Sequence, residues 1–420
     1  SEFIIVAVNP DVRRIFIAQA LRAFAYGFGA VLLGVSLEAA GWSSGRVGVL
    51  LTAIVAGTAL MSVAVGTLGD RIGRRRFYTG LFLGLAATGA VFALTDGFWV
   101  LVPVALAGAL STDVVESGPF TSLEQAMLPA GLDGKGRTRV FGHYNAIATV
   151  AGSIGALTAG GPALLRDAIS GFPADHRLFL AFVPVGLLGA IIASQLSAGV
   201  EVEKRPGLGL PLHRSRSNVA RLAGLFAVDS FAGGFVIQSF IAYWFRLKFG
   251  VSVEVLGLVF FAVGILQAGS FMVATRLAER IGLLNTMVFT HLPSNLFLAA
   301  IPLAPSFPVA MLLLLGRFAL SQMDVPTRQA YIAALVDPDE RTAAAAYTNT
   351  ARYATRPFGP ALAGVAQQVA LGLPFFIGGG VKAMYDVAVW MWFRRIPIDE
   401  ETRAPVTGGG QRKQKEEIAR

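Results

Sequence analysis

The sequence contains no cysteine and only four histidines in 420 residues. Without cysteine, the chain has no disulfide framework, no thiolate metal site and no cysteine nucleophile. Soft metal ions prefer thiolate and imidazole ligands, so export of such metals is disfavoured as well. We therefore expect no bound metal.

Motifs of enzymes and ATP-driven pumps are also scarce. No His-Glu-x-x-His zinc motif occurs, and Gly134-Lys135-Gly136 lacks the rest of a phosphate-binding loop. We therefore expect no enzyme activity and no cofactor. Any transport should draw on an ion gradient or on the gradient of the solute itself.

Charge is scarce too: 15% of the residues are charged, against about 25% in soluble domains. The apolar residues form long runs, such as 47–68, 77–94 and 178–195. A run of about 20 residues crosses a hydrocarbon core as a helix, because lipid offers the backbone no hydrogen-bond partner. These runs predict an all-α integral membrane protein with twelve spans, at 14–38, 47–68, 77–95, 98–123, 141–165, 178–197, 221–245, 253–275, 283–304, 307–330, 343–370 and 373–393.

The net charge of +9 lies mainly in alternate loops between these runs. Short loops rich in Lys and Arg stay in the cytoplasm. This pattern predicts a multi-pass protein of the cell inner (plasma) membrane with both termini cytoplasmic. We expect the lipid bilayer, not a nucleic acid, as the partner of these residues: Arg71, Arg74, Arg75, Arg76, Lys135, Arg137, Arg139, Lys204, Arg205, Arg214, Arg216, Arg221, Arg276, Arg280, Arg394 and Arg395.

A polar, basic segment with Pro206 and Pro211 divides the chain near its middle. We expect a six-helix half at 1–198, a cytoplasmic linker at 199–220, a second six-helix half at 221–398 and a mobile cytoplasmic tail at 399–420.

The two halves repeat each other. Six residues of the first half recur as the same residue type in the second half, each the same number of positions later. The pairs are Arg137 and Arg341, Thr138 and Thr342, Asn145 and Asn349, Gly155 and Gly359, Ala159 and Ala363, and Gly160 and Gly364. Pro119 also matches Pro326, Phe24 matches Phe231, and 68–73 matches 277–282. A direct repeat of six spans predicts two parallel halves around an axis along the membrane normal.

The segment 66–75, Gly-Thr-Leu-Gly-Asp-Arg-Ile-Gly-Arg-Arg, resembles the signature loop of the major facilitator superfamily. The resemblance implies an alternating-access fold with a central cavity lined mainly by spans one, four, seven and ten. It assigns a conformational role to Gly66, Asp70, Arg71, Gly73, Arg74 and Arg75. Twelve spans suffice for one pathway, so we expect a monomer.

Span five carries Gly155-Ala156-Leu157-Thr158-Ala159-Gly160-Gly161, which resembles the Gly-Pro-x-x-Gly-Gly element of family members that exchange drugs for protons. The proline is missing here. The small residues also form a stripe suited to close helix packing, and we favour packing.

Ionisable groups inside spans are costly and mark functional sites. The proton-coupling candidates are Asp113, Glu116, Asp229 and Asp324. Arg22 and Asp229 occupy equivalent positions of the repeat, where their opposite charges would face each other across the cavity. The substrate-cavity candidates are Arg22, Asn145, Gln238, Arg317, Gln322, Arg352 and Arg356.

Lys382 and Asp386 are four residues apart, so we expect them to satisfy each other. For His291, which precedes Pro293 and Asn295, a satisfied polar kink is favoured over a ligand.

Two functions remain open. The first is proton-coupled export of a small molecule, with the carboxylates as carriers. The second is transport of an anionic solute bound by cavity arginines. Ion-paired arginines would favour the first and unpaired ones the second. The sequence leaves open the substrate, the direction, the coupling ion and which buried charges are gate pairs.

Overall fold

The computed structural model describes residues 9–107, 109–111, 118–128, 134–161, 169, 175–201, 214–336 and 341–396. Throughout these residues the regular structure is helical. The N-terminal half comprises α2 (Pro10–Ala39), α3 (Ser44–Ile72), α4 (Arg74–Leu94), α5 (Phe98–Leu106), α6 (Pro119–Met127), α7 (Gly134–Thr158), η1 (His176–Ala181), α9 (Phe182–Ser194) and η2 (Ala198–Val200).

The C-terminal half comprises α10 (Arg216–Gly234), α11 (Gln238–Phe249), α12 (Val253–Ile281), α13 (Leu283–Ala300), η3 (Ile301–Leu303), α14 (Phe307–Ser321), α15 (Asp324–Leu335), α16 (Arg341–Thr355), α17 (Phe358–Val369) and α18 (Leu373–Phe393). In the described residues, eight helical stretches are long and apolar enough to cross a membrane. Every predicted span coincides with one helix or with two consecutive helices, which confirms the twelve-helix fold.

Spans four, seven, ten and eleven are each built from two helices, whereas the sequence predicted continuous ones. Three of these breaks, those of spans four, seven and eleven, coincide with residues that interrupt helices. Pro357 separates α16 from α17, Gly118 and Pro119 open α6, and Gly234 ends α10. Discontinuous helices put free backbone groups at mid-membrane depth, where transporters of this architecture bind their ligands.

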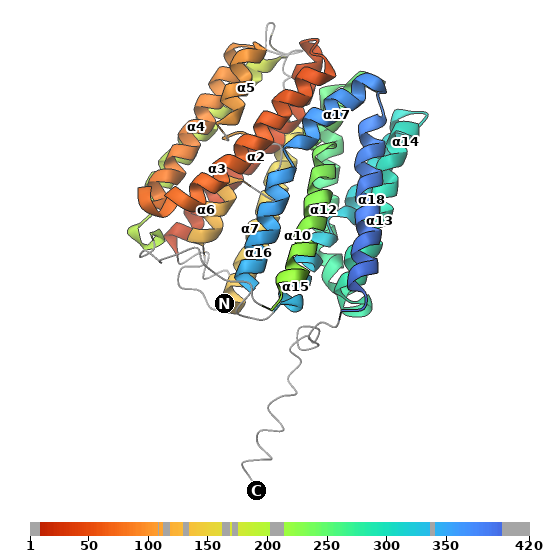
Figure 1. Ribbon diagram of the computed structural model, residues 1–420. Helices are drawn as coiled ribbons and strands as arrows, with labels where there is room; N and C mark the ends of the chain where they lie inside the picture. The colour runs from red at the N-terminus through yellow and green to blue at the C-terminus, as the bar shows by residue number, and fades with distance from the viewer. Residues whose placement is uncertain are drawn as a thin grey trace.

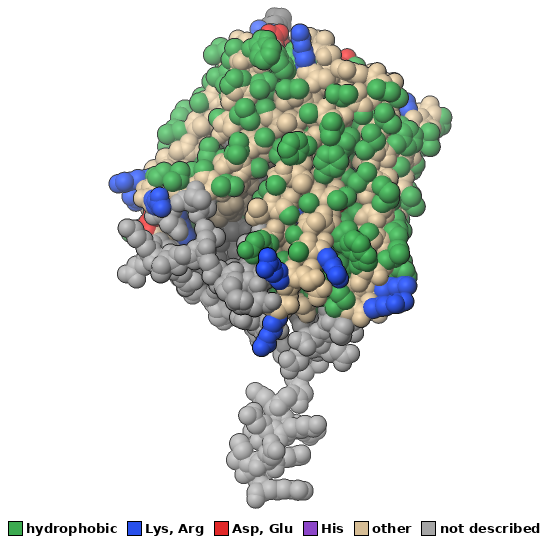
Figure 2. Space-filling model, in the orientation of Figure 1, with side chains coloured by type: hydrophobic (Ala, Val, Ile, Leu, Met, Phe, Trp, Pro, Cys, Tyr) green, Lys and Arg blue, Asp and Glu red, His purple; other side chains and the backbone are tan. Residues whose placement is uncertain are grey.

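The helices run up and down between two ends of the molecule (Figure 1). The upper end carries the turns at 40–43, 95–97, 250–252, 304–306 and 370–372. The lower end carries the start of α2, the turns at Gly73 and Gly282, and the end of α18. On the face seen in Figure 2, hydrophobic side chains cover the middle, and most Lys and Arg side chains gather toward the lower end.

The repeat is visible in two glycines at the lower end. Gly73 joins α3 to α4 with φ +98°, and Gly282 joins α12 to α13 with φ +86°. Each donates its N–H to the carbonyl four residues earlier, Gly69 at 3.0 Å and Ala278 at 2.9 Å. Because positive φ strains residues with a Cβ, the matched glycines of 68–73 and 277–282 meet the same backbone requirement.

A second repeated contact lies inside each half. A Cβ on Gly155 of α7 would lie 2.0 Å from the Phe24 carbonyl oxygen, and one on Gly359 of α17 would lie 2.7 Å from that of Phe231. Both glycines let a helix touch the backbone of the first span of its half. The sequence pairing of Phe24 with Phe231 and of Gly155 with Gly359 is therefore a structural equivalence.

The halves meet along a seam formed by α2 with α11, α3 with α17, and α7 with α12. Near the upper end the backbones touch: a Cβ on Gly48 would lie 2.4 Å from the Pro360 carbonyl oxygen, and one on Gly34 would lie 2.5 Å from that of Ser239. Such close approach requires glycine on the facing surfaces.

Polar contacts tie the same seam. The Ala361 amide donates to Thr52 Oγ1 at 2.8 Å, and the Tyr243 hydroxyl donates to the Trp42 carbonyl at 3.0 Å. Arg246 Nε lies 3.0 Å from Glu38 Oε2. The structure is thus closed at the upper end.

Candidate functional site

A polar cavity of about 180 Å³ lies within the C-terminal half. Helices α10 to α16 and α18 contribute to its wall, so it sits around the breaks between α10 and α11 and between α14 and α15. The lining residues are Asp229, Ser230, Gly233, Val236, Ile237, Gln238, Gln267, Phe271, His291, Arg317, Phe318, Ser321, Gln322, Asp324, Val325, Arg328, Arg352, Arg356 and Lys382.

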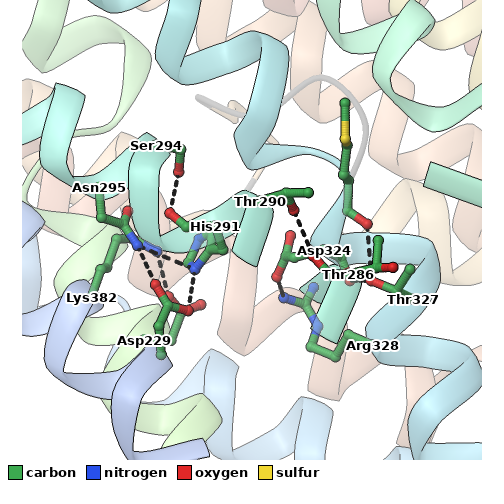
Figure 3. Close-up of polar contacts among 12 residues, drawn as sticks. Asp229, Thr286, Thr290, His291, Ser294, Asn295, Asp324, Thr327, Arg328 and Lys382 are labelled. Atoms are coloured by element: carbon green, nitrogen blue, oxygen red, sulfur yellow. Dashed lines mark hydrogen bonds and ion pairs between the residues drawn. The ribbon is translucent and has the colours of Figure 1, made fainter. Parts of the chain in front are cut away.

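Asp229 of α10 and Lys382 of α18 form an ion pair on this wall (Figure 3). Lys382 Nζ lies 2.6 Å from Asp229 Oδ1, and both residues are buried. The tight packing of α18 against α10 brings the two charges together. A carboxylate and an ammonium removed from water stabilise each other only in such close contact.

His291 and Asn295 of α13 hold a second carboxylate, that of Asp386 on α18. His291 Nδ1 lies 2.8 Å from Asp386 Oδ1, and Asn295 Nδ2 donates to Asp386 Oδ2 at 2.8 Å. The prediction that Lys382 and Asp386 satisfy each other is therefore wrong: each prefers a partner across a helix interface. His291 is satisfied, as expected, but it also reaches the cavity.

Asp324 and Arg328 form a third pair one turn apart on α15. Arg328 Nη1 lies 2.6 Å from Asp324 Oδ2, and both are buried. The pairs influence one another, because Asp229 interacts electrostatically with His291 and Arg328, and His291 does so with Asp324 and Lys382. Three ion pairs thus build a single charge network.

Arg317 of α14 differs from these groups. Its side chain lines the cavity and is 8% exposed, yet no hydrogen bond or ion pair joins it to another described residue. Its Nε is buried without a partner. Its guanidinium carbon lies 4.6 Å from the ring centre of Phe318, which also lines the cavity.

The N-terminal half contains a sealed polar cluster around Glu124 of α6. Arg22 of α2 donates to both carboxylate oxygens, at 3.3 and 2.8 Å. The hydroxyls of Tyr78 and Tyr144 donate to the same oxygens, at 2.7 and 2.5 Å. Glu124 is 0% exposed and Arg22 2%. Four donated hydrogen bonds satisfy the buried carboxylate, so the cluster is complete without a ligand.

The structure brings most predicted site residues together. Seven of them line the cavity of the C-terminal half: Asp229, Gln238, Arg317, Gln322, Asp324, Arg352 and Arg356. Arg22 and Asn145 lie on α2 and α7 of the other half. Arg22 and Asp229 do not pair with each other, because each has a partner inside its own half. Asp113 and Glu116 lie outside the described residues.

The predicted conformational loop lies at the lower end of α3 and α4. Gly73 makes the turn, and Glu201 caps α4: its carboxylate accepts from the backbone amides of Arg74 and Arg75 at 2.8 and 3.2 Å. Arg75 also donates to the Leu196 carbonyl at 3.1 Å. Arg71 is exposed, whereas the surroundings of Gly66 and of the Asp70 side chain lie outside the described residues. The loop is thus tied to the segment that follows α9.

Sequence reasoning missed Glu124 and Arg328. The predicted end of span four, residue 123, stopped one residue short of Glu124. Arg328 could have been found, because it stands four residues after Asp324 on the same helix, a spacing typical of ion pairs.

Sequence reasoning also passed over Gly41-Trp42-Ser43-Ser44-Gly45, which matches the Gly-x-Ser-x-Gly motif of the nucleophile elbow in serine hydrolases. That elbow joins a strand to a helix. Here Ser43 joins two helices, and its Oγ caps α3 through the Arg46 amide at 3.5 Å. The motif is a helix start.

Comparisons with known proteins agree with this architecture. The family model described as Major Facilitator Superfamily matches residues 15–210 and 222–418. An uncharacterized membrane protein of Saccharomyces cerevisiae is 24% identical over 425 residues, which cover 92% of this chain and 94% of the yeast protein.

Solved structures share the fold. The nucleoside transporter NupG superposes with a TM-score of 0.71 at 13% identity, over 91% of this chain and 99% of NupG. The D-xylose-proton symporter gives 0.70 at 13% identity, over 90% and 97%. The human organic anion transporter MFSD10 gives 0.60 at 17% identity, over 90% and 99%. At these identities the likeness extends to the fold alone.

Proposed function

The chain belongs to the major facilitator superfamily of secondary transporters, and we propose that it couples the movement of a small molecule to protons through the cavity of the C-terminal half. It is a multi-pass membrane protein and not an enzyme. We further propose that it works as a monomer, with one pathway between its halves.

The observation that carries the proposal is the network of ionisable pairs on the cavity wall. Asp229 with Lys382 and Asp324 with Arg328 line the cavity directly, and His291 joins them to Asp386. An ion pair that only stabilises the fold does not need to line a cavity, as the fully buried pair of Glu124 with Arg22 demonstrates. Carboxylates that reach a cavity can exchange protons with its water.

Such exchange would change the affinity for a solute. Two unit charges 4 Å apart interact by about 4 kcal/mol at an effective dielectric constant of 20. A proton on Asp229 would therefore release Lys382 and alter the field throughout the network. By linkage, a solute that prefers one charge state changes proton affinity by the same factor.

The state described here supports alternating access. The seam closes the upper end, and the positive-inside rule places the basic lower end in the cytoplasm. We propose that the structure represents the state closed toward the outside. The proposed direction is export, supported by the glycine-rich element of α7, although packing against Phe24 and Glu254 also accounts for Gly155 and Gly160.

The test is solute-driven proton movement in proteoliposomes that contain a trapped pH dye. Asp229→Asn is compared with wild type and with Glu279→Gln, which removes an exposed carboxylate from α12. We expect a solute-dependent pH change in wild type and control that Asp229→Asn abolishes. Solute movement without any pH change in wild type would refute coupling.

Two further measurements complete the assay. In inverted membrane vesicles, proton-driven export appears as uptake, so uptake driven by an acidic interior supports the proposed direction and its absence contradicts it. Asp113 and Glu116 remain proton-coupling predictions. Glu116→Gln in the same dye assay tests whether the carrier lies in span four instead of span seven.

A further inference from the structure

Arg317 is the charged group on the cavity wall that the described protein leaves without a hydrogen-bond partner. A guanidinium carries five N–H donors and stays charged. Asp229 interacts with this guanidinium electrostatically, but no hydrogen bond joins Arg317 to another described residue, and its Nε is buried without a partner. Burying a charged group without hydrogen-bond partners costs several kcal/mol, and proteins tolerate that cost at functional sites. The 8% exposed Arg317 side chain faces the cavity, so a ligand there can supply the missing acceptors.

Ser321 stands next to it. It lies four residues after Arg317 on α14, hence on the same face, and also lines the cavity. Ser321 is 7% exposed, and its Oγ is buried without a hydrogen-bond partner. Two residues that line one cavity and stand one turn apart thus each carry a donor without a hydrogen-bond partner, which suits a recognition surface better than a packing surface.

The start of α11 adds a third feature. Val236, Ile237 and Gln238 line the cavity, and no side chain caps this helix. The first amides of a helix point outward and carry a partial positive charge that favours anions. The break between α10 and α11 therefore turns a positive helix end toward the same space.

The charge and size of the cavity further restrict the class of ligand that it can bind. Among the described residues, five Lys or Arg side chains, His291 and two Asp side chains line the cavity. Its volume of about 180 Å³ is smaller than the roughly 300–1,000 Å³ typical of pockets for drug-sized ligands. In this state the site therefore suits a small anionic metabolite better than a bulky hydrophobic cation.

We propose that Arg317 and Ser321 hold the oxyanion group, a carboxylate or a phosphate, of a small organic solute. The Phe318 ring lies close to the guanidinium, and the start of α11 faces the bound oxygens. A planar guanidinium matches both oxyanions through two parallel hydrogen bonds. The inference rests on the proposed transport function and names the chemical class of its substrate.

The test measures ligand-induced thermal stabilisation of the purified protein in detergent. The probes are lactate, succinate and glycerol 3-phosphate, each with an uncharged counterpart: lactamide, succinamide and glycerol. Choline serves as the cationic probe. We expect at least one anion to raise the unfolding temperature while its uncharged counterpart and choline do not. The carboxylate and phosphate arms identify which oxyanion the site accepts.

Variants tie the effect to the site. Arg317→Gln should weaken binding of the active anion by about 10- to 100-fold, as expected for a hydrogen bond to a charged group, and Ser321→Ala by about 2- to 10-fold. Arg276→Gln, which removes an exposed positive charge from α12, is the matched control and should bind as wild type does. Arg317→Lys retains the charge but not the fork and should fall between wild type and Arg317→Gln.

The outcomes separate this inference from the proposed coupling. Stabilisation by an uncharged or cationic probe, no response to any anion, or unchanged binding in a folded Arg317→Gln protein would overturn the oxyanion site. Anion binding that depends on Arg317, together with anion transport lacking a pH change, would uphold the site and refute proton coupling alone.

Discussion

The two halves carry buried charge at equivalent positions and use it differently. Arg22 in α2 and Asp229 in α10 correspond in the repeat, and each forms an ion pair within its own half. The pair of Arg22 with Glu124 is sealed and further satisfied by two tyrosine hydroxyls. The pair of Asp229 with Lys382 instead faces a cavity.

The difference lies in what surrounds each pair. In the N-terminal half, Tyr26 and Phe120 cover the Arg22 guanidinium with ring centres 5.4 and 5.6 Å from its central carbon. In the C-terminal half, the helix breaks and the polar residues of α14 leave space. The comparison indicates that the pair of Arg22 with Glu124 serves stability, while the pair of Asp229 with Lys382 stays accessible from the cavity.

Breaking the sealed pair should have the largest effect. Glu124→Gln leaves Arg22 buried without a counter-charge, and we expect a loss of about 3–5 kcal/mol in the free energy of unfolding. Thermal unfolding of the purified protein, with Glu279→Gln as control, measures it. An unfolding temperature equal to that of the control would contradict a structural role.

The double variant Arg22→Met with Glu124→Leu sharpens the same test. A well-packed apolar pair of similar volume often replaces a buried ion pair without loss. We expect stability close to wild type and retained transport. A stable double variant without transport would instead give Arg22 and Glu124 a functional role.

The cavity pair should respond differently. Asp229→Asn should cost about 1–3 kcal/mol of stability, less than Glu124→Gln, because Lys382 reaches the cavity and its water. It should nevertheless abolish coupled transport. Unfolding temperature and solute flux are measured in parallel for Asp229→Asn and Glu124→Gln. A loss of stability in Asp229→Asn as large as that in Glu124→Gln would contradict the proposed difference between the two ion pairs.

The seam tests whether the halves move as units. Gly48→Val places side-chain atoms against the Pro360 carbonyl, and strain of about 1–3 kcal/mol should shift the closed state toward opening by about 5- to 150-fold. Since the chain has no native cysteine, Thr52→Cys with Ala361→Cys reports closure through the rate of oxidative cross-linking. We expect a slower rate with Gly48→Val.

Gly80→Val is the matched control, because a Cβ on Gly80 meets nothing within 4 Å. It should cross-link as the parent does. Equal rates in all three proteins would mean that the seam at Gly48 does not hold the upper end closed.

The smallest effect should come from Glu38→Gln. Its partner Arg246 is partly exposed, and such pairs contribute about 0–1 kcal/mol. The shift in unfolding temperature should vanish at 1 M salt, where the screening length is about 3 Å. A shift that persists at high salt would show that the pair acts as a buried gate.

The fold could be predicted almost completely from sequence, because lipid permits a single local solution for long apolar runs. The site could be predicted in part. Charged residues such as Asp229 and Arg317 stand out in apolar segments, so most of the Asp, Lys and Arg residues of the described cavity wall were identified.

Partners could not be predicted, because they depend on how helices face each other. Lys382 has Asp386 one turn away in sequence, yet it pairs with Asp229 on another helix. Glu124 lay beyond the predicted end of its span. The helix break that precedes it has a sequence signal, Gly118-Pro119, but how deeply that break places Glu124 in the protein depends on tertiary packing.

The glycines of the seam also constrain how this sequence can change over time. Gly48 faces Pro360 and Gly364, and Gly364 in turn touches the backbone of Ser44. A larger residue on either side requires a compensating change on the other half. The two halves are therefore not free to change independently where they touch, and paired substitutions at these positions should mark related sequences that share this closed end.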